Sequence, residues 1–164
     1  MLRWTNLCLI LAVCAGCGSY DLKVNERVVY SPRPLFTDFD IADTALSECV
    51  EQAILDNQVT IAGELQILNC SHAGIKDLGG LAVFNGITQL KLSANSIRNL
   101  VELEALSLLQ ALYLDDNTVV DPVPLYDLPS LQTLDLSGNV DLQCPVASAL
   151  LQVEDLKLPQ HCND

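Results

Sequence analysis

Two groups of residues in this chain have the types that bind metal ions. Cys70 and His72 lie two residues apart, and His161 is followed directly by Cys162. Two thiolates and two imidazoles would form a tetrahedral zinc site if the fold brought them together. The run DLSGNVD at 135–141 spaces oxygen-bearing side chains as a calcium loop does. Whether either group binds an ion depends on the elements that position it.

The acidic pair Asp115 and Asp116 is the remaining candidate for chemistry, since carboxyl groups can act as general acid and base. The sequence places no cleft or perturbing neighbour beside them, and it contains no Gly-x-Ser-x-Gly, His-Glu-x-x-His or phosphate-loop motif. The calcium loop is also incomplete, because its twelfth position requires glutamate and is Val146. We therefore expect no enzyme, no catalytic residue and no cofactor.

Composition narrows the class of protein further. The chain has 164 residues, enough for one domain, and it is 50% apolar with only 5% aromatic residues, which predicts an aliphatic core. The net charge of −13 would repel a polyanion, so nucleic acid is excluded as a partner. Seven cysteines favour an oxidising compartment.

The first 16 residues have the pattern of a secretory signal. Arg3 precedes an apolar run over 7–13, which is far shorter than the roughly 20 residues that span a bilayer. Ala15-Gly16-Cys17 resembles the lipobox of bacterial lipoproteins, although Cys14 stands where that family has leucine or a similar residue. The resemblance implies lipidation at Cys17 and an outer-membrane location in the bacterial envelope. The alternative is cleavage to a free soluble protein.

Residues 17–39 lack a sustained periodicity and contain Pro32 and Pro34, so we expect a lipidated tether. The alternative is that RVVY, at 27–30, forms a strand along the edge of the domain. Residues 40–64 are predicted to form a helical N-terminal cap, with Asp40 or Asp43 capping the helix and Gly63 after its end. The apolar stripe of this helix comprises Leu46, Cys49, Val50, Ala53 and Ile54.

From residue 65 onward the chain repeats itself every 22 residues. Rows begin at Leu65, Ile87, Leu109, Leu131 and Val153. The same seven positions of the first three rows are apolar or cysteine; in the first row they are Leu65, Leu68, Cys70, Ile75, Leu78, Leu81 and Phe84. The ninth position carries Asn95, Asn117 and Asn139, whose amides can bond the backbone of a buried turn. Such a fixed period predicts stacked coils.

This pattern resembles the leucine-rich repeats of bacterial internalins over residues 65–161. The resemblance implies an α/β solenoid with short parallel strands on its concave face, a helical N-terminal cap and a C-terminal cap. We assign 65–152 to the repeats and 153–164 to a truncated repeat and cap, because Asp141 breaks the apolar pattern of the fourth row. A helical bundle is the alternative, and the recurring asparagine turns disfavour it.

The stacked coils constrain the cysteines and the zinc site. Strands lie about 4.8 Å apart, so Cys70 and Cys162, four coils apart, are separated by roughly 19 Å. That distance excludes a disulfide between them and a shared metal ion. Cys49–Cys70 and Cys144–Cys162 are the expected disulfides, with buried free thiols as the alternative. We expect no metal site, with His72 on the surface and His161 in place of a turn asparagine.

The concave face is the expected binding surface, because strand side chains alternate and those between the leucines point outward. The candidate partner-binding residues are Lys91, Tyr113, Asp115, Asp116 and Asp135. Tyr113 lies at the centre, and tyrosine is enriched in binding hot spots. They could equally be ordinary solvated strand residues. The sequence thus predicts an envelope-anchored module that binds a protein or glycan, with a structural envelope-maintenance lipoprotein as the alternative.

Overall fold

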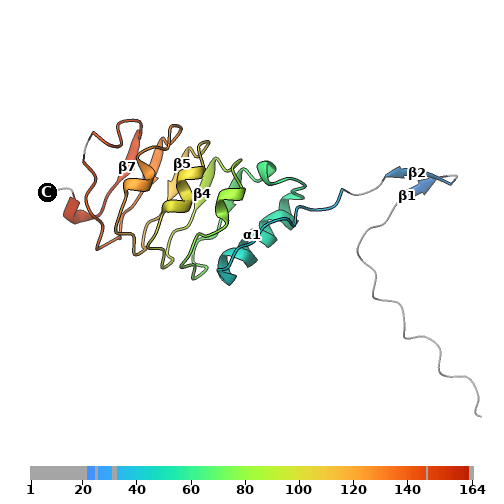
Figure 1. The fold of residues 1–164 in the computed structure, drawn as a ribbon, viewed down its shortest axis with the longest axis horizontal. Coiled ribbons are helices and arrows are strands. Elements are labelled where there is room, and N and C mark those ends of the chain that lie inside the picture. The colour runs from blue at the N-terminus through green and yellow to red at the C-terminus, as the bar shows by residue number, and fades with distance from the viewer. Residues whose placement is uncertain (1–21, 25, 31–32, 147, 163–164) are drawn as a thin grey trace, which may run out of the picture. The chain divides into compact units, whose positions relative to one another are not determined.

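The computed structural model describes residues 22–24, 26–30, 33–146 and 148–162, and the chain divides into two units, 1–34 and 35–164 (Figure 1). The signal segment and the lipidation site at Cys17 lie outside the described residues. In the part that is described, no helix has both the length and the apolar character needed to cross a membrane.

The N-terminal unit contains a short hairpin where we expected an irregular tether. Strands β1 (Leu22–Val24) and β2 (Arg27–Tyr30) pair antiparallel, and Glu26 adopts φ 63° in the turn between them. Valine-rich segments favour extended backbone, and the tight turn lets them pair locally. The alternative reading of RVVY as a strand is therefore correct, but its partner is β1, in a separate two-stranded sheet, and not the edge of the repeat domain.

The predicted helix is α1, which spans Thr44–Asn57. Asp43 is the residue that caps it, because its side chain accepts a hydrogen bond from the amide of Leu46 at 3.1 Å. Gln58, in the left-handed conformation, ends the helix. Gly63 instead belongs to the 3-10 helix η1 (Ala62–Glu64). The apolar stripe faces inward as expected, with its central residues buried in the same core as the repeats.

Asp43 also connects α1 to the first coil. Its second carboxylate oxygen, Oδ2, accepts hydrogen bonds from the amides of Lys76 at 2.8 Å and Asp77 at 3.1 Å. One side chain thus caps a helix and binds a turn more than 30 residues further along the chain. The sequence predicts only the capping contact.

The repeat rows form a five-stranded parallel sheet. Its strands, in spatial and sequence order, are β3 (Ile67–Asn69), β4 (Gln89–Lys91), β5 (Ala111–Tyr113), β6 (Thr133–Asp135) and β7 (Asp155–Lys157). Each residue pairs with the one 22 positions later, as the repeat requires. The 3-10 helices η2 (Leu81–Val83), η3 (Val101–Ala105) and η4 (Val123–Leu125) follow one another in a second row (Figure 1). A short 3-10 helix, η5 (Gln160–Cys162), follows β7.

The core is built from aliphatic residues at equivalent positions of successive coils. Leu68, Leu90, Leu112 and Leu134 occupy the middle of four adjacent strands and are fully buried. No single coil encloses this core, so neighbouring coils share it. At the first coil, the rings of Phe36 and Phe39 pack around Phe84 with centroid distances of 5.8 and 5.4 Å.

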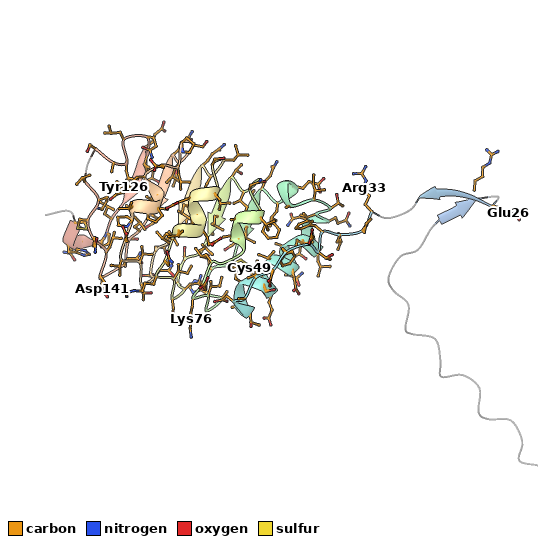
Figure 2. The ribbon with its side chains drawn as sticks, viewed as in Figure 1. Glu26, Arg33, Cys49, Lys76, Tyr126 and Asp141 are labelled. Carbon is orange, nitrogen blue, oxygen red and sulfur yellow. A yellow bond between two sulfur atoms is a disulfide. The ribbon has the colours of Figure 1, made fainter. Side chains whose placement is uncertain are left out.

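The regular pattern breaks down in the last two rows. Asp141 is exposed and lies at the rim of the stacked coils (Figure 2), and Leu142 fills the core at 3% exposure. The amide of Leu142 bonds the carbonyl of Asn139 at 3.2 Å, so the turn is one residue longer before it re-enters the core. In the following row Leu156, the equivalent of the buried strand leucines, is 38% exposed.

Candidate binding face of the sheet

The outward side of the sheet carries mostly polar side chains, interrupted by Ile67, Ala111 and Pro159, and we call it the polar face. It comprises positions 3, 5 and 7 of each row. The members at position 5 are Asn69, Lys91, Tyr113, Asp135 and Lys157, and those at position 7 are Ser71, Ser93, Asp115, Ser137 and Pro159. Alternation places these side chains opposite the leucines because successive strand residues point to opposite sides.

At the centre of the polar face, side chains from neighbouring strands contact each other. The ammonium group of Lys91 lies 5.4 Å from the ring centroid of Tyr113, within the range of a cation–π interaction. The hydroxyl of Ser93 donates to a carboxylate oxygen of Asp115 at 2.6 Å. Tyr113 is half-buried, so its ring is held in place while part of it still faces solvent.

Asp135 is held more tightly than the other candidate residues. It is 7% exposed and accepts hydrogen bonds from the hydroxyl of Ser137 at 2.5 Å and its amide at 3.1 Å. Lys157 forms a salt bridge with its other oxygen at 3.1 Å. Burial raises the pKa of Asp135, but the bonds from Ser137 and Lys157 outweigh it, and the pKa lies below its usual value. Asp135 therefore supports the face and offers little surface of its own.

Asp116 lies beside the polar face and not on it. Its backbone is left-handed, with φ 53°, and it occupies the eighth position of the repeat. His72, Ala94 and Gly138 occupy the same position with φ of 59°, 54° and 77°. The side chain of Asp116 is exposed, and its amide donates to the carbonyl of Ser137 at 2.9 Å. A partner contacting Tyr113 and Asp115 would meet Asp116 only at the end of the strand.

The three predicted turn asparagines bond the backbone of two coils at once. The Oδ1 atom of Asn95 accepts from three consecutive amides of the preceding coil, those of residues 73–75, at 2.8–3.1 Å. Its Nδ2 donates to the carbonyls of Cys70 and Leu92. Asn117 and Asn139, one and two coils later, are buried; each accepts from one amide of the preceding coil and donates to carbonyls of both coils. These bonds fix the end of each strand and so the spacing of the polar face.

Both predicted disulfides are confirmed. Cys49 on α1 bonds Cys70, which follows β3, with a Cα–Cα distance of 5.9 Å. Cys144 bonds Cys162 with a Cα–Cα distance of 5.3 Å. Figure 2 shows Cys49 on the helix at the N-terminal end of the repeat unit. The alternative of buried free thiols is therefore excluded for these four cysteines.

The structure groups His161 and Cys162, which are adjacent in the sequence, with Cys144, which the sequence did not connect to the histidine. Ligand atoms of Cys144, His161 and Cys162 lie within 4.8 Å of one another. The two sulfurs form the disulfide, however, and a disulfide provides no thiolate for a metal ion. The ring of His161 contacts the carbonyl of Leu142 at 2.9 Å, a different contact from those of the turn asparagines. His161 therefore does not form the backbone bonds of a turn asparagine, which the sequence predicted for it. The reason is that the longer turn of the fourth row shifts the backbone that His161 would bind.

Comparison with known proteins identifies the repeat. Over 84 residues, 49% of the chain, it is 37% identical to leucine-rich repeat-containing protein 56 of Rattus norvegicus. The crystal structure of internalin C2 from Listeria monocytogenes matches 60% of the chain at 30% identity, with a TM-score of 0.51. The repeats of the chain have the leucine-rich repeat fold. An internalin (inlF) of the same organism matches 72% of it with a TM-score of 0.60 at 22% identity, and that match shows the fold alone.

The chain spans less than half the length of each of these relatives. It spans 15% of the rat protein, 42% of internalin C2 and 36% of the second internalin. No protein-family model matches the chain. The likeness therefore concerns the repeats and suggests a protein-interaction module.

Proposed function

We propose that this leucine-rich repeat protein is a lipid-anchored binding module of the bacterial envelope that presents its polar face to a protein or glycan partner. The observation that carries the proposal is the fixed position of Tyr113 on the central strand, with Lys91 against its ring and Asp115 two residues further along the chain. Tyrosine combines apolar area with a hydroxyl group and is frequent in hot spots.

The contacts among the polar side chains support this role in a second way. Lys91, Ser93 and Asp115 are already held by neighbours, so less side-chain entropy is lost when a partner binds. The area sets a limit, because five strands at about 4.8 Å span roughly 24 Å and offer on the order of 400 Å². That is about half of one partner's share of a standard interface, so binding is weak unless anchoring raises the local concentration.

Helix α1 and the C-terminal segment act as caps in this proposal. The buried stripe of α1 and the Cys49–Cys70 disulfide support the N-terminal assignment, because they cover the first coil and attach the helix to it. The Cys144–Cys162 disulfide supports the assignment of the C-terminal segment as a cap. Without α1, the first coil would expose its leucines.

The anchor is proposed at Cys17, on the resemblance of Ala15-Gly16-Cys17 to a lipobox. Gly18, which follows the cysteine, favours the outer membrane on the same resemblance. Cys17→Ser should abolish incorporation of labelled fatty acid and release the protein from membranes. A mutant that still takes up label and sediments with membranes would contradict the assignment.

The binding role is tested by photo-crosslinking in cells from an unnatural amino acid at Thr133, which lies on the polar face and pairs with Ala111, two residues before Tyr113. Tyr113→Ala combined with Asp115→Ala should leave the protein folded and abolish capture of the partner. The matched control is Glu102→Ala with Glu104→Ala on η3. Capture that survives the first pair and is lost with the control pair would refute binding through the polar face.

A structural envelope-maintenance role is the second candidate. The observation in its favour is that Asp135 and Lys157 already bond each other, which leaves fewer free polar groups for a partner. This role predicts that envelope integrity depends on the folded repeats and their disulfides and tolerates Tyr113→Ala. The crosslinking variants above therefore distinguish the two functions.

A further inference from the structure

The two edges of the five-stranded sheet differ. At the N-terminal edge, α1 packs against β3, and a disulfide attaches the helix there. At the other edge, β7 pairs with β6 alone within the described part of the chain. All three residues of β7 are exposed, whereas the middle residue of each other strand is buried. The edge at β7 is therefore an open one.

The backbone of β7 presents the hydrogen-bonding groups that the inner strands use to bind their next neighbour. At the two ends of β6, the carbonyl of Gln132 accepts from the amides of Glu154 and Asp155, and the amide of Leu136 donates to the carbonyl of Lys157. The same positions in the β7 row are the carbonyl of Glu154 and the amide of Leu158. Among the described backbone hydrogen bonds, neither group has a partner. An added parallel strand could therefore bond to β7 through the same backbone groups that β7 uses to bond to β6.

The open edge is also apolar on its core side. Leu156 aligns with Leu134 in the sheet but is 38% exposed where the inner leucine is fully buried. Leu151, in the turn before β7, is 81% exposed. An aliphatic residue at the fourth position of a further strand would cover Leu156 just as Leu156 covers Leu134.

The charges at this edge indicate which kind of strand fits. Glu154 and Asp155 occupy the second and third positions of the last row and are exposed. The same positions of the four preceding rows are uncharged; they carry Gln66, Ile67, Thr88, Gln89, Gln110, Ala111, Gln132 and Thr133. Like charges directly opposite each other on neighbouring strands are unfavourable, and opposite charges are favourable. The edge thus repels a second acidic β7 and favours a basic strand.

We propose that β7 is a docking edge for an extended basic and apolar segment of another protein, which adds to the sheet as a sixth parallel strand. Lysine or arginine of that segment lies opposite Asp155, and an aliphatic side chain covers Leu156. The sheet already contains such a pair, since Lys157 on β7 bonds Asp135 on β6 at 3.1 Å. This edge is separate from Tyr113 on the central strand and does not depend on a partner of the polar face.

The test is the affinity of fluorescently labelled synthetic peptides for the full chain, measured by anisotropy. The basic peptide is Ser-Thr-Lys-Leu-Thr-Leu-Thr, and the acidic peptide has glutamate in place of the lysine. Asp155→Lys should weaken the basic peptide roughly five- to tenfold and strengthen the acidic one, because the cross-strand charge pair is reversed. Asp127→Lys, at an exposed acid outside the strands, is the matched control; it makes the same change in net charge and should alter both affinities far less than Asp155→Lys does.

Three further measurements separate strand addition from simple charge attraction to this acidic protein. Proline in place of the threonine before lysine removes the N–H that β7 itself donates at that position, and it should abolish binding without changing peptide charge. Leu156→Glu should do the same, and circular dichroism should report an unchanged fold because this side chain is already exposed. On binding, the amide of Leu158 should become protected from hydrogen exchange.

Equal affinity for the basic, acidic and proline peptides would overturn the proposal, as would the absence of saturable binding. A concentration-dependent dimer that Leu156→Glu dissociates would also overturn it, because a second copy would then occupy the edge.

Discussion

Replacing Asp43 tests whether one carboxylate attaches α1 to the repeats. Its Oδ1 accepts from Leu46 in the first turn of the helix, and its Oδ2 accepts from the amides of Lys76 and Asp77 in the first coil. Asp43→Ala removes all three bonds. Asp43→Ser retains the capping bond, because serine is a good cap, but its shorter side chain cannot also reach the coil.

The expected magnitudes follow from these bonds. Loss of a helix cap costs about 1 kcal/mol of unfolding free energy. Hydrogen bonds to a charged group are worth about 1.5–3 kcal/mol each when buried. The side chains of Lys76 and Asp77 are exposed and Asp43 is half-buried, so water replaces part of the lost contact and we discount the pair to about 1–2 kcal/mol in total. We therefore expect about 1–2 kcal/mol for Asp43→Ser and about 2–3 kcal/mol for Asp43→Ala.

The assay is urea unfolding followed by circular dichroism, with thermal melting as a second measure. For a unit of this size, 1 kcal/mol corresponds to a change in Tm of about 3–4 °C. The matched control is Asp40→Ser, which removes a nearby exposed acid that the sequence also offered as a cap. Asp40→Ser should leave stability unchanged, because the capping bond belongs to Asp43.

The difference between the wild-type protein and Asp43→Ser should depend on pH. Burial raises the pKa of Asp43, but bonds from the backbone amides of Lys76, Leu46 and Asp77 outweigh it, so the pKa is lowered in the folded state. A lowered pKa stabilises the fold above the unfolded value of about 3.9, and this stabilisation is lost as the pH falls through the folded pKa. The difference should thus be full at neutral pH and shrink in acid.

Two results would refute this reasoning. If Asp43→Ser were as stable as the wild-type protein, the bonds to Lys76 and Asp77 would contribute nothing. If the difference between the two proteins grew as the pH fell, the sign of the pKa shift would be wrong.

Three further predictions concern the packing of the repeats. Replacing Cys49 and Cys70 together by serine should lower the unfolding free energy by about 3 kcal/mol, measured in urea without reductant, since the bridge closes a loop of 21 residues. Asn139→Ala should cost about 3 kcal/mol in the same assay, because it leaves several buried backbone groups unsatisfied. Gly86→Ala would place its Cβ 2.1 Å from the carbonyl oxygen of Gly63 and should lower the Tm, whereas Gly63→Ala, with its nearest neighbour at 3.9 Å, should not.

The sequence alone determined everything that repeats. The period of 22 residues predicted the parallel register from β3 to β7, the buried leucines and the asparagine-bonded turns, because a fixed period requires each coil to pack on the next in the same way. The spacing between coils also excluded a bond between Cys70 and Cys162, and the two disulfides in the structure agree with that exclusion.

Only the tertiary structure decided what does not repeat. The second contact of Asp43 joins residues 33 positions apart, and no periodic pattern encodes such a contact. Leu142 enters the core in place of Asp141 because the last turn is longer, and Asp135 is buried because Ser137 and Lys157 surround it. The exposure of Leu156 has the same kind of cause. Its residue type and position match those of the buried leucines, and it differs only because no coil lies beyond it in the described structure.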